Sequence, residues 1–233
     1  MPKPLAPHTR RAIAQALDRL DGEALGAMYC DDGGATWWKE KRRACVTLGV
    51  PLAEALLDRV SPKGRSLYVG AGVAEVPMLA AETSVGHREA AAYNLREAEV
   101  ALLNQACPPL PVRFLPADGT TAEGTYDHLW VVSVFNDPER FPELSALSYG
   151  RANPVTFDPE AFTRERAAVR DLVDRCLRKL ARPGLVTTSV EELSWVTDWC
   201  VRRGIAFAVD EEEYPTAIVE DPVCFIRVGE FQK

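Results

Sequence analysis

The sequence predicts an α/β domain whose mostly parallel, doubly wound sheet follows an N-terminal helical appendage. Three observations predict this fold class. A short apolar run ends abruptly in Gly70-Ala71-Gly72 and gives way to a helical pattern, and nucleotide-binding domains begin with this strand, glycine turn and helix. From residue 65 onward, apolar runs of strand length alternate with amphipathic stretches of helix length, which predicts a parallel sheet with helices on both faces. The residues before that point show helical periodicity alone.

The N-terminal segment, residues 1–61, is expected to form a helical appendage or lid. Its expected helices are 9–28, 37–48 and 51–60. Thr9 is suited to cap the first of them, and Pro51 suits the first turn of the last. The Ser-Pro-Lys-Gly sequence at 61–64 is typical of a hinge, so the second domain is expected to comprise residues 62–233.

Seven strands and four helices are expected in that second domain. The strands are 65–69, 89–94, 112–115, 128–135, 185–189, 205–210 and 223–228, and the helices are 75–82, 95–106, 160–180 and 190–203. The run at 128–135 is apolar nearly throughout, as a strand covered on both faces should be. Arg182-Pro183-Gly184 is expected to end the long helix, and 216–219 to be a further extended segment. Residues 136–159 form a long loop, and loops of this length are often lids or binding loops.

Composition favours a globular cytoplasmic protein. Hydrophobic residues make up 47% of the chain and charged residues 26%, and no apolar run reaches the roughly 18–20 residues that cross a bilayer. The proline-rich start lacks the apolar core of a signal peptide. The six cysteines and three histidines are scattered without metal-ligand spacing, so neither a zinc site nor a disulfide framework is expected.

The net charge of −7 is a poor basis for neutralising phosphates, so binding of nucleic acid is not expected. One basic cluster, at residues 39–43, lies beside Trp37 and Trp38. It is either a binding surface or a solvated helix face with two packed tryptophans.

In a doubly wound sheet, ligands bind at the carboxyl ends of the strands. The residues at four successive strand ends are Gly70, Ala71 and Gly72, then Asn94 and Leu95, then Asp118 and Gly119, then Ser133, Asn136 and Asp137. Gly70 and Asn94 lie 24 positions apart, close to the interval at which such domains place a ribose-binding polar residue. Asp118 could accept a hydrogen bond from an adenine amino group. The alternatives are that Asn94 caps the following helix and that Asp118-Gly119 is simply a turn.

Over residues 60–230 the chain resembles the class I S-adenosylmethionine-dependent methyltransferases. Residues 67–72 are similar to the family's first motif, the glycine loop beneath the methionine part of the cofactor. Asn94 falls where the family usually has an acid for the ribose hydroxyls, and 114–118 resembles the segment whose acid contacts the adenine. Tyr126-Asp127 looks like the pair that opens the fourth strand.

The resemblance implies a seven-stranded Rossmann-like sheet with an antiparallel final pair and S-adenosylmethionine as cofactor. The cofactor contacts that it implies come from Tyr68, Gly70, Ala71, Gly72, Asn94, Leu95, Asp118, Gly119 and Ser133. The sequence departs from the family at Tyr68, in the place of a common acid, at Ala74, in the place of a third glycine, and at Asn94. Because charged hydrogen bonds are stronger than neutral ones, Asn94→Asp is expected to tighten cofactor binding by up to about tenfold.

The favoured function is methyl transfer to an unidentified acceptor, expected to be a small molecule. Asp137 is the first candidate base, and the candidate acceptor-binding residues are Trp37, Trp38, Asn136, Tyr149 and Arg151. The alternative is a non-catalytic binding or scaffold protein with a methyltransferase fold, which the altered positions motivate. A dinucleotide-dependent dehydrogenase is disfavoured because Glu75 stands where a small residue is needed, and a P-loop nucleotidase because no G-K-[ST] follows the glycines.

Overall fold

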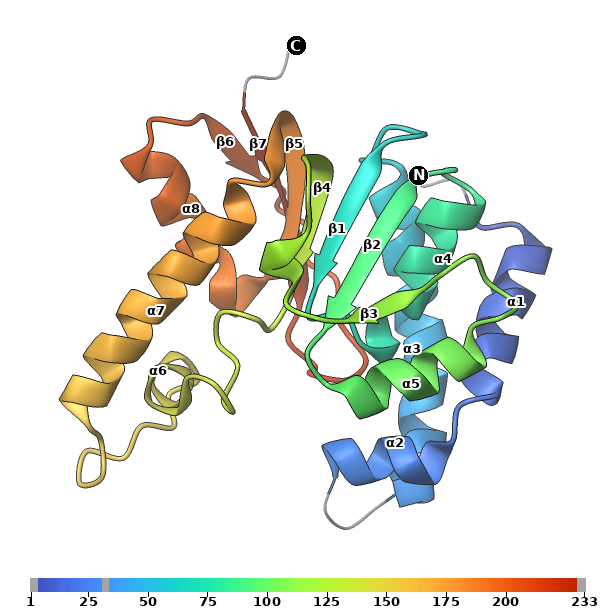
Figure 1. Ribbon diagram of the computed structural model, residues 1–233, viewed down its shortest axis with the longest axis horizontal. Helices are drawn as coiled ribbons and strands as arrows, with labels where there is room; N and C mark the ends of the chain where they lie inside the picture. Colours follow the sequence, from blue (N-terminus) through green and yellow to red (C-terminus); the bar gives the residue numbers. More distant parts are fainter. Residues whose placement is uncertain (1–3, 31–33, 230–233) are drawn as a thin grey trace.

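A computed structural model describes residues 4–30 and 34–229 of the chain. Its centre is a seven-stranded sheet in the order β3-β2-β1-β4-β5-β7-β6 (Figure 1). The strands are β1 (Arg65–Val69), β2 (Glu89–Asn94), β3 (Phe114–Pro116), β4 (Tyr126–Val131), β5 (Leu180–Ser189), β6 (Phe207–Val209) and β7 (Val223–Val228). The strands β1 to β5 pair in parallel, whereas β7 runs antiparallel to both β5 and β6. The expected mostly parallel, doubly wound sheet is therefore confirmed.

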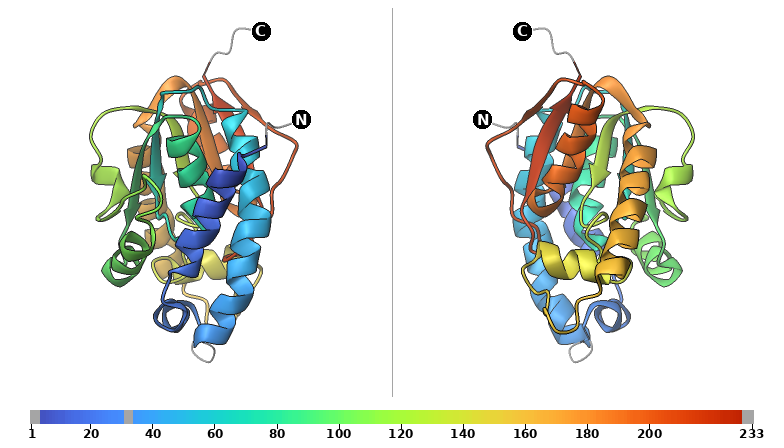
Figure 2. Two further views of the ribbon diagram at one scale, coloured as in Figure 1. Left: turned by 90° about the vertical axis from the view of Figure 1, so that its right-hand side faces the viewer. Right: turned by 90° about the vertical axis from the view of Figure 1, so that its left-hand side faces the viewer.

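Helices cover both faces of this sheet. They are α1 (Pro7–Asp18), α2 (Gly22–Tyr29), α3 (Gly34–Leu57), α4 (Val76–Ser84), α5 (Glu97–Ala106), α6 (Pro142–Ser148), α7 (Pro159–Leu177) and α8 (Leu193–Arg202). Figure 2 shows α1 and α3 on one side of the molecule and α6, α7 and α8 on the other. Short 3₁₀ turns follow three of the strands, at Val73–Glu75, Gly119–Thr121 and Val190–Glu192.

Alternate strand residues supply the two hydrophobic cores. Tyr68 and Trp130 point to the side of α1, α3, α4 and α5, whereas Leu67 and Val131 point to the side of α7 and α8. The first of these clusters also contains Leu56 of α3, together with buried residues of α1. The N-terminal helices thus share one hydrophobic core cluster with the sheet, and the boundary expected at residues 61–62 stays a prediction.

Two helix boundaries in the N-terminal segment differ from the expectation. The helix expected over 9–28 is two helices, because Asp21 caps α2 by accepting hydrogen bonds from the backbone N–H groups of Glu23 and Ala24. Pro51 does not begin a new helix but lies inside α3. Next to this proline, α3 and α4 approach closely, because a Cβ at Gly49 would lie only 2.6 Å from the Pro77 ring.

Four further predictions in the second domain were wrong. β4 ends at Val131 rather than at residue 135, and the loop expected over 136–159 contains α6. The sequence Arg182-Pro183-Gly184 does not precede β5 but lies inside it. The pairing of β5 with β4 shifts register there, so the proline does not have to donate a hydrogen bond to a neighbouring strand. The segment expected to be extended at 216–219 is not a strand.

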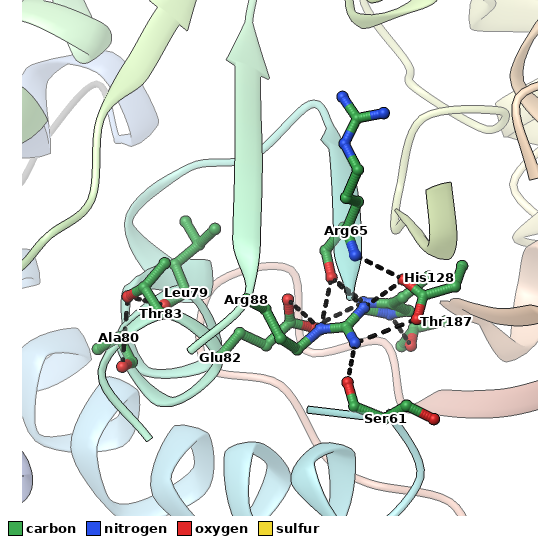
Figure 3. A network of polar contacts seen from close by, with 11 residues as sticks. Ser61, Arg65, Leu79, Ala80, Glu82, Thr83, Arg88, His128 and Thr187 are labelled. Carbon is green, nitrogen blue, oxygen red and sulfur yellow. Dashed lines mark hydrogen bonds and ion pairs between the residues drawn. The ribbon is translucent and has the colours of Figure 1, made fainter. Parts of the chain in front are cut away.

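A buried polar network joins the amino ends of the strands (Figure 3). The Arg88 guanidinium donates to Ser66 Oγ at 3.0 Å and to Asp127 Oδ1 at 2.6 Å, and its Nε lies 3.4 Å from Glu82 Oε2. His128 Nδ1 lies 2.7 Å from the other oxygen of Glu82. Burial alone would raise the pKa of Glu82, but His128 and Arg88 more than offset this and leave it below its ordinary value. The network therefore holds α4 and the segment before β2 against β1 and β4.

Candidate functional site

A cavity of about 460 Å³ lies at the carboxyl ends of β1, β2, β3 and β4, within the range of small-molecule sites. In Figure 1 the arrowheads of β1 and β2 point toward this end of the molecule, where α2 also lies. The lining residues that the sequence predicted are Gly70, Gly72, Asn94, Leu95, Asp118, Gly119, Ser133 and Asp137. The structure therefore brings together residues from all four strand ends around one cavity.

The glycine turn needs its two glycines for different reasons. Gly70 has φ of +76°, a conformation that L side chains rarely adopt, and a Cβ there would lie 2.9 Å from Val134. Gly72 has an ordinary extended φ of −121°, so its requirement is one of space. A Cβ on Gly72 would lie 2.7 Å from Glu99 Oε1 and 3.2 Å from the Tyr29 hydroxyl oxygen.

Glu75 folds back onto this turn and accepts a hydrogen bond from the Gly72 N–H at 2.7 Å. Burial raises the pKa of Glu75 to about 7; the Gly72 N–H opposes the rise, and Glu99 adds to it. Sequence reasoning used Glu75 only as an argument against dinucleotides and missed it as a lining residue. Its carboxyl ties the start of the turn to the start of α4, although Ala74 stands where a third glycine is usual.

Asn94 lines the cavity, but its amide is engaged on both sides. Its Nδ2 donates to the Ala71 carbonyl at 2.9 Å and to Glu99 Oε2 at 3.1 Å. Its Oδ1 accepts from the Arg96 N–H at 2.8 Å, just before α5 begins. The alternative that Asn94 caps the following helix is wrong, because the N-cap residue of α5 is Arg96 and no side chain caps that helix. An aspartate at position 94 would place a second carboxylate against Glu99 and the Ala71 carbonyl oxygen. The expectation that Asn94→Asp tightens cofactor binding was therefore wrong.

We now expect Asn94→Asp to lower the free energy of unfolding by about 1–3 kcal/mol, because it removes two buried hydrogen-bond donors and adds a like charge. Urea denaturation at neutral pH measures this. Asn104→Asp is the matched control. Like the Asn94 amide, the Asn104 amide both donates to and accepts from the backbone, in this case that of Phe114, but Asn104 is exposed. Equal stability of Asn94→Asp and the parent would contradict the hydrogen-bond pattern around Asn94.

Asp118 lines the cavity and also caps the turn after β3. Its Oδ1 accepts from the Thr120 N–H at 2.9 Å, and Arg175 Nη1 lies 3.7 Å from Oδ2. Burial opposes ionisation, but the Thr120 N–H and Arg175 hold the pKa of Asp118 below its ordinary value. The carboxylate is therefore ionised beside the cavity. The alternative that Asp118-Gly119 forms a turn is confirmed, and the adenine role stays a prediction.

Ser133 stands where the chain leaves β4. Its φ of +55° is unusual for a residue with a side chain, and its buried hydroxyl has no hydrogen-bond partner among the described residues. The loop that it begins is held by Glu192, whose carboxylate accepts from the N–H groups of Phe135 and Asn136. Burial raises the pKa of Glu192 to about 7, with those N–H groups opposing the rise. Glu192 thus helps to place Asp137, and no sequence pattern pointed to this role of Glu192.

Two of the predicted cofactor residues do not line the cavity. Tyr68 is fully buried on the opposite side of β1, where its ring stacks on Trp130 at 5.4 Å between centroids. It belongs to the hydrophobic core, because successive residues of a strand point to opposite faces. Ala71 is also buried in that core, and only its backbone takes part in the turn.

None of the five residues predicted to bind the acceptor lines the cavity. Trp38 packs against Gly22, and Trp37 stacks on Tyr29. The remaining three are engaged elsewhere: Asn136 bonds the Glu191 carbonyl and Trp195, the Tyr149 hydroxyl bonds Asp221, and the Arg151 guanidinium lies over the Tyr149 ring. In the structure these side chains are engaged in packing and in contacts with other protein groups, away from the cavity.

Several lining residues were not predicted. They come from α2 (Met28 and Tyr29), from β2, the turn after it and α5 (Tyr93, Arg96 and Glu99), from the loop after β4 (Glu139 and Arg140) and from the segment between β6 and β7 (Thr216, Ile218 and Val219). Within residues 4–30 and 34–229, no helix is long and apolar enough to cross a bilayer, and no group of three His, Cys, Asp or Glu side chains could hold a metal ion.

No protein-family model and no curated protein sequence matches the chain. Solved structures do. Magnesium protoporphyrin IX methyltransferase from Synechocystis PCC 6803, with S-adenosylmethionine bound, superposes with a TM-score of 0.52 at 11% identity, covering 98% of this chain and 100% of that one. A methyltransferase from Pyrococcus furiosus gives a TM-score of 0.51 at 15% identity, covering 95% of both chains. With this sheet order and these neighbours, the chain has the fold of the class I S-adenosylmethionine-dependent methyltransferases.

Proposed function

We propose that the protein transfers a methyl group from S-adenosylmethionine to a small-molecule acceptor. One observation carries this proposal: a cavity of ligand size lies beneath the Gly70–Gly72 turn and is bounded by Asn94, Asp118 and Ser133, at the carboxyl ends of four adjacent strands. In doubly wound sheets this edge is where nucleoside-containing ligands bind.

The charge of the cavity fits the cofactor. Its acidic lining residues are Glu75, Glu99, Asp118, Asp137 and Glu139, against two arginines, Arg96 and Arg140. A lining of this sign favours a ligand that carries positive charge, as a sulfonium and an ammonium group do. The unpartnered hydroxyl of Ser133 offers a further polar contact. When bound, S-adenosylmethionine supplies a methyl group already activated on sulfur.

Gly70 and Gly72 would give a ligand close access to the backbone, while Asn94, Leu95, Asp118 and Gly119 would hold its nucleoside part. The remaining task of the chain is to align an acceptor and exclude water, which requires no charged catalytic group. Where the acceptor must lose a proton, Asp137 is the proposed base, because it lines the cavity and its Oδ1 is fixed by the Glu139 N–H at 2.9 Å. We propose a cytoplasmic location. We also expect that the acceptor is not a nucleic acid, because the net charge of −7 disfavours binding of phosphates.

We expect isothermal calorimetry to give saturable 1:1 binding of S-adenosylmethionine and S-adenosylhomocysteine. Binding of neither ligand would remove the methyltransferase proposal. The second candidate function, a non-catalytic scaffold, is favoured by the commitment of the Asn94 amide to protein groups. Cofactor binding without turnover on any acceptor found by mass spectrometry of co-purified small molecules would support that candidate instead.

A further inference from the structure

Tyr29, the last residue of α2, joins the N-terminal helices to the cavity that it lines. Its ring stacks on Trp37 of α3, with 5.2 Å between centroids and 11° between planes. Its hydroxyl donates a hydrogen bond of 2.6 Å to Glu99 Oε1. One face of the Tyr29 side chain therefore belongs to the helical segment, and its polar end belongs to the cavity wall.

The bond to Glu99 continues into the glycine turn. Glu99 is almost completely buried, and its second oxygen accepts from Asn94 Nδ2, which also donates to the Ala71 carbonyl. Burial, and then Glu99, raise the pKa of Tyr29 well above its ordinary value, so the phenol keeps the proton that it donates. A chain of hydrogen bonds thus runs from α2 through Glu99 and Asn94 to the turn between β1 and α4.

The ring of Tyr29 also supports the opposite wall. The Arg96 guanidinium lies 5.5 Å from the ring centroid, within the range of a cation–π interaction. From there Arg96 Nη2 reaches Glu139 Oε1 at 2.6 Å, in the loop that carries Asp137. Tyr29 therefore contacts Glu99, which is connected by hydrogen bonds to the glycine turn, and Arg96, which pairs with the loop after β4.

We infer that Tyr29 is a positioning residue for the cofactor, and that its hydroxyl holds the Glu99 carboxylate, and through it Asn94 and the glycine turn, in the arrangement that binds a positively charged adenosyl ligand. This inference rests on the proposed function. It assigns to α2 a part in the cofactor site itself. Without the hydroxyl, Glu99 is a buried carboxylate that has lost its strongest hydrogen-bond donor, and it turns toward other donors.

Tyr29→Phe tests this inference, because it removes the hydroxyl but keeps the ring, the stack on Trp37 and the contact with Arg96. We expect calorimetry to give about tenfold weaker binding of S-adenosylmethionine, the effect of one hydrogen bond to a charged group. Tyr126→Phe is the matched control. The Tyr126 hydroxyl bonds the Glu123 carbonyl and its ring lies under Arg65, but it does not line this cavity.

A double-mutant cycle separates positioning from a general loss of stability. Glu99→Gln alone is expected to weaken binding, but it should add little to Tyr29→Phe, since both remove the same contact; additive effects would overturn the inference. Thermal unfolding of each variant identifies any loss that comes from folding. If the parent binds the ligand and Tyr29→Phe binds it equally well, the inference fails alone. If the parent binds neither S-adenosylmethionine nor S-adenosylhomocysteine, the proposed function fails first.

Discussion

Replacing Arg88 by methionine is expected to lower the free energy of unfolding by about 3–5 kcal/mol, the cost of removing one partner from a buried ion pair. The Arg88 side chain is fully buried and pairs with Glu82 (Figure 3). It also pairs with Asp127. Methionine has a similar length, so little packing is lost. What remains is a buried Glu82 carboxylate that keeps His128 beside it but has lost its guanidinium partner.

Urea denaturation at neutral pH measures this loss. Arg202→Met is the control, because Arg202 forms a surface ion pair with Asp198 at 3.0 Å in which both side chains are about half exposed. Such pairs contribute little, so the control should change stability by less than about 1 kcal/mol. Equal, small effects of the two variants would mean that the buried network does not hold the strand ends.

The pH dependence of stability gives a second readout of the same network. Because the pKa of Glu82 is lowered in the folded state, its ionisation stabilises the fold fully above the pKa of an unfolded glutamate, about 4.3. That stabilisation is lost as the pH falls through the lowered pKa. In Arg88→Met the pKa of Glu82 rises, and we expect acid unfolding to begin at a higher pH than in the parent.

The sequence was most informative where main-chain geometry decides the structure. The bounds of β1, β2 and β7 were predicted to the residue. The alternation of apolar runs was enough to predict the sheet. The ends of β1 to β4 were enough to predict eight residues that line the cavity, since the carboxyl ends of parallel strands meet at one edge of a sheet.

The sequence was least informative about which way side chains point. Tyr68 occupies the position of a family motif, but the parity of β1 sends its ring into the core. Tyr29 and Glu99 lie 70 positions apart, and no local pattern links them. One signal was available: Glu99 lies on the apolar face of α5 with Val100 and Leu103, and a carboxylate at such a position needs a partner.

The largest effect on ligand binding is expected from Gly72→Val. The backbone of Gly72 could accept valine, since its φ of −121° is ordinary, so the fold should persist. The added Cβ, however, would lie 2.7 Å from Glu99 Oε1. The two methyl groups of valine would then have to occupy part of the cavity or push the Tyr29 hydroxyl aside. Overpacking of this kind costs about 1–3 kcal/mol, and its upper end corresponds to about a hundredfold loss of affinity for S-adenosylmethionine.

Calorimetry on the folded variant measures that loss, with circular dichroism to verify the fold. Gly204→Asn is the control: Gly204 has φ of +62°, which asparagine tolerates, and nothing lies within 4 Å of its Cβ position. It should bind the ligand as the parent does. Should Gly72→Val also bind like the parent, the glycines between β1 and α4 serve only to turn the chain, and the cavity beside them is not the cofactor site. A hundredfold loss restricted to Gly72→Val would instead place the ligand against the turn that Glu75, Asn94 and Glu99 hold in position.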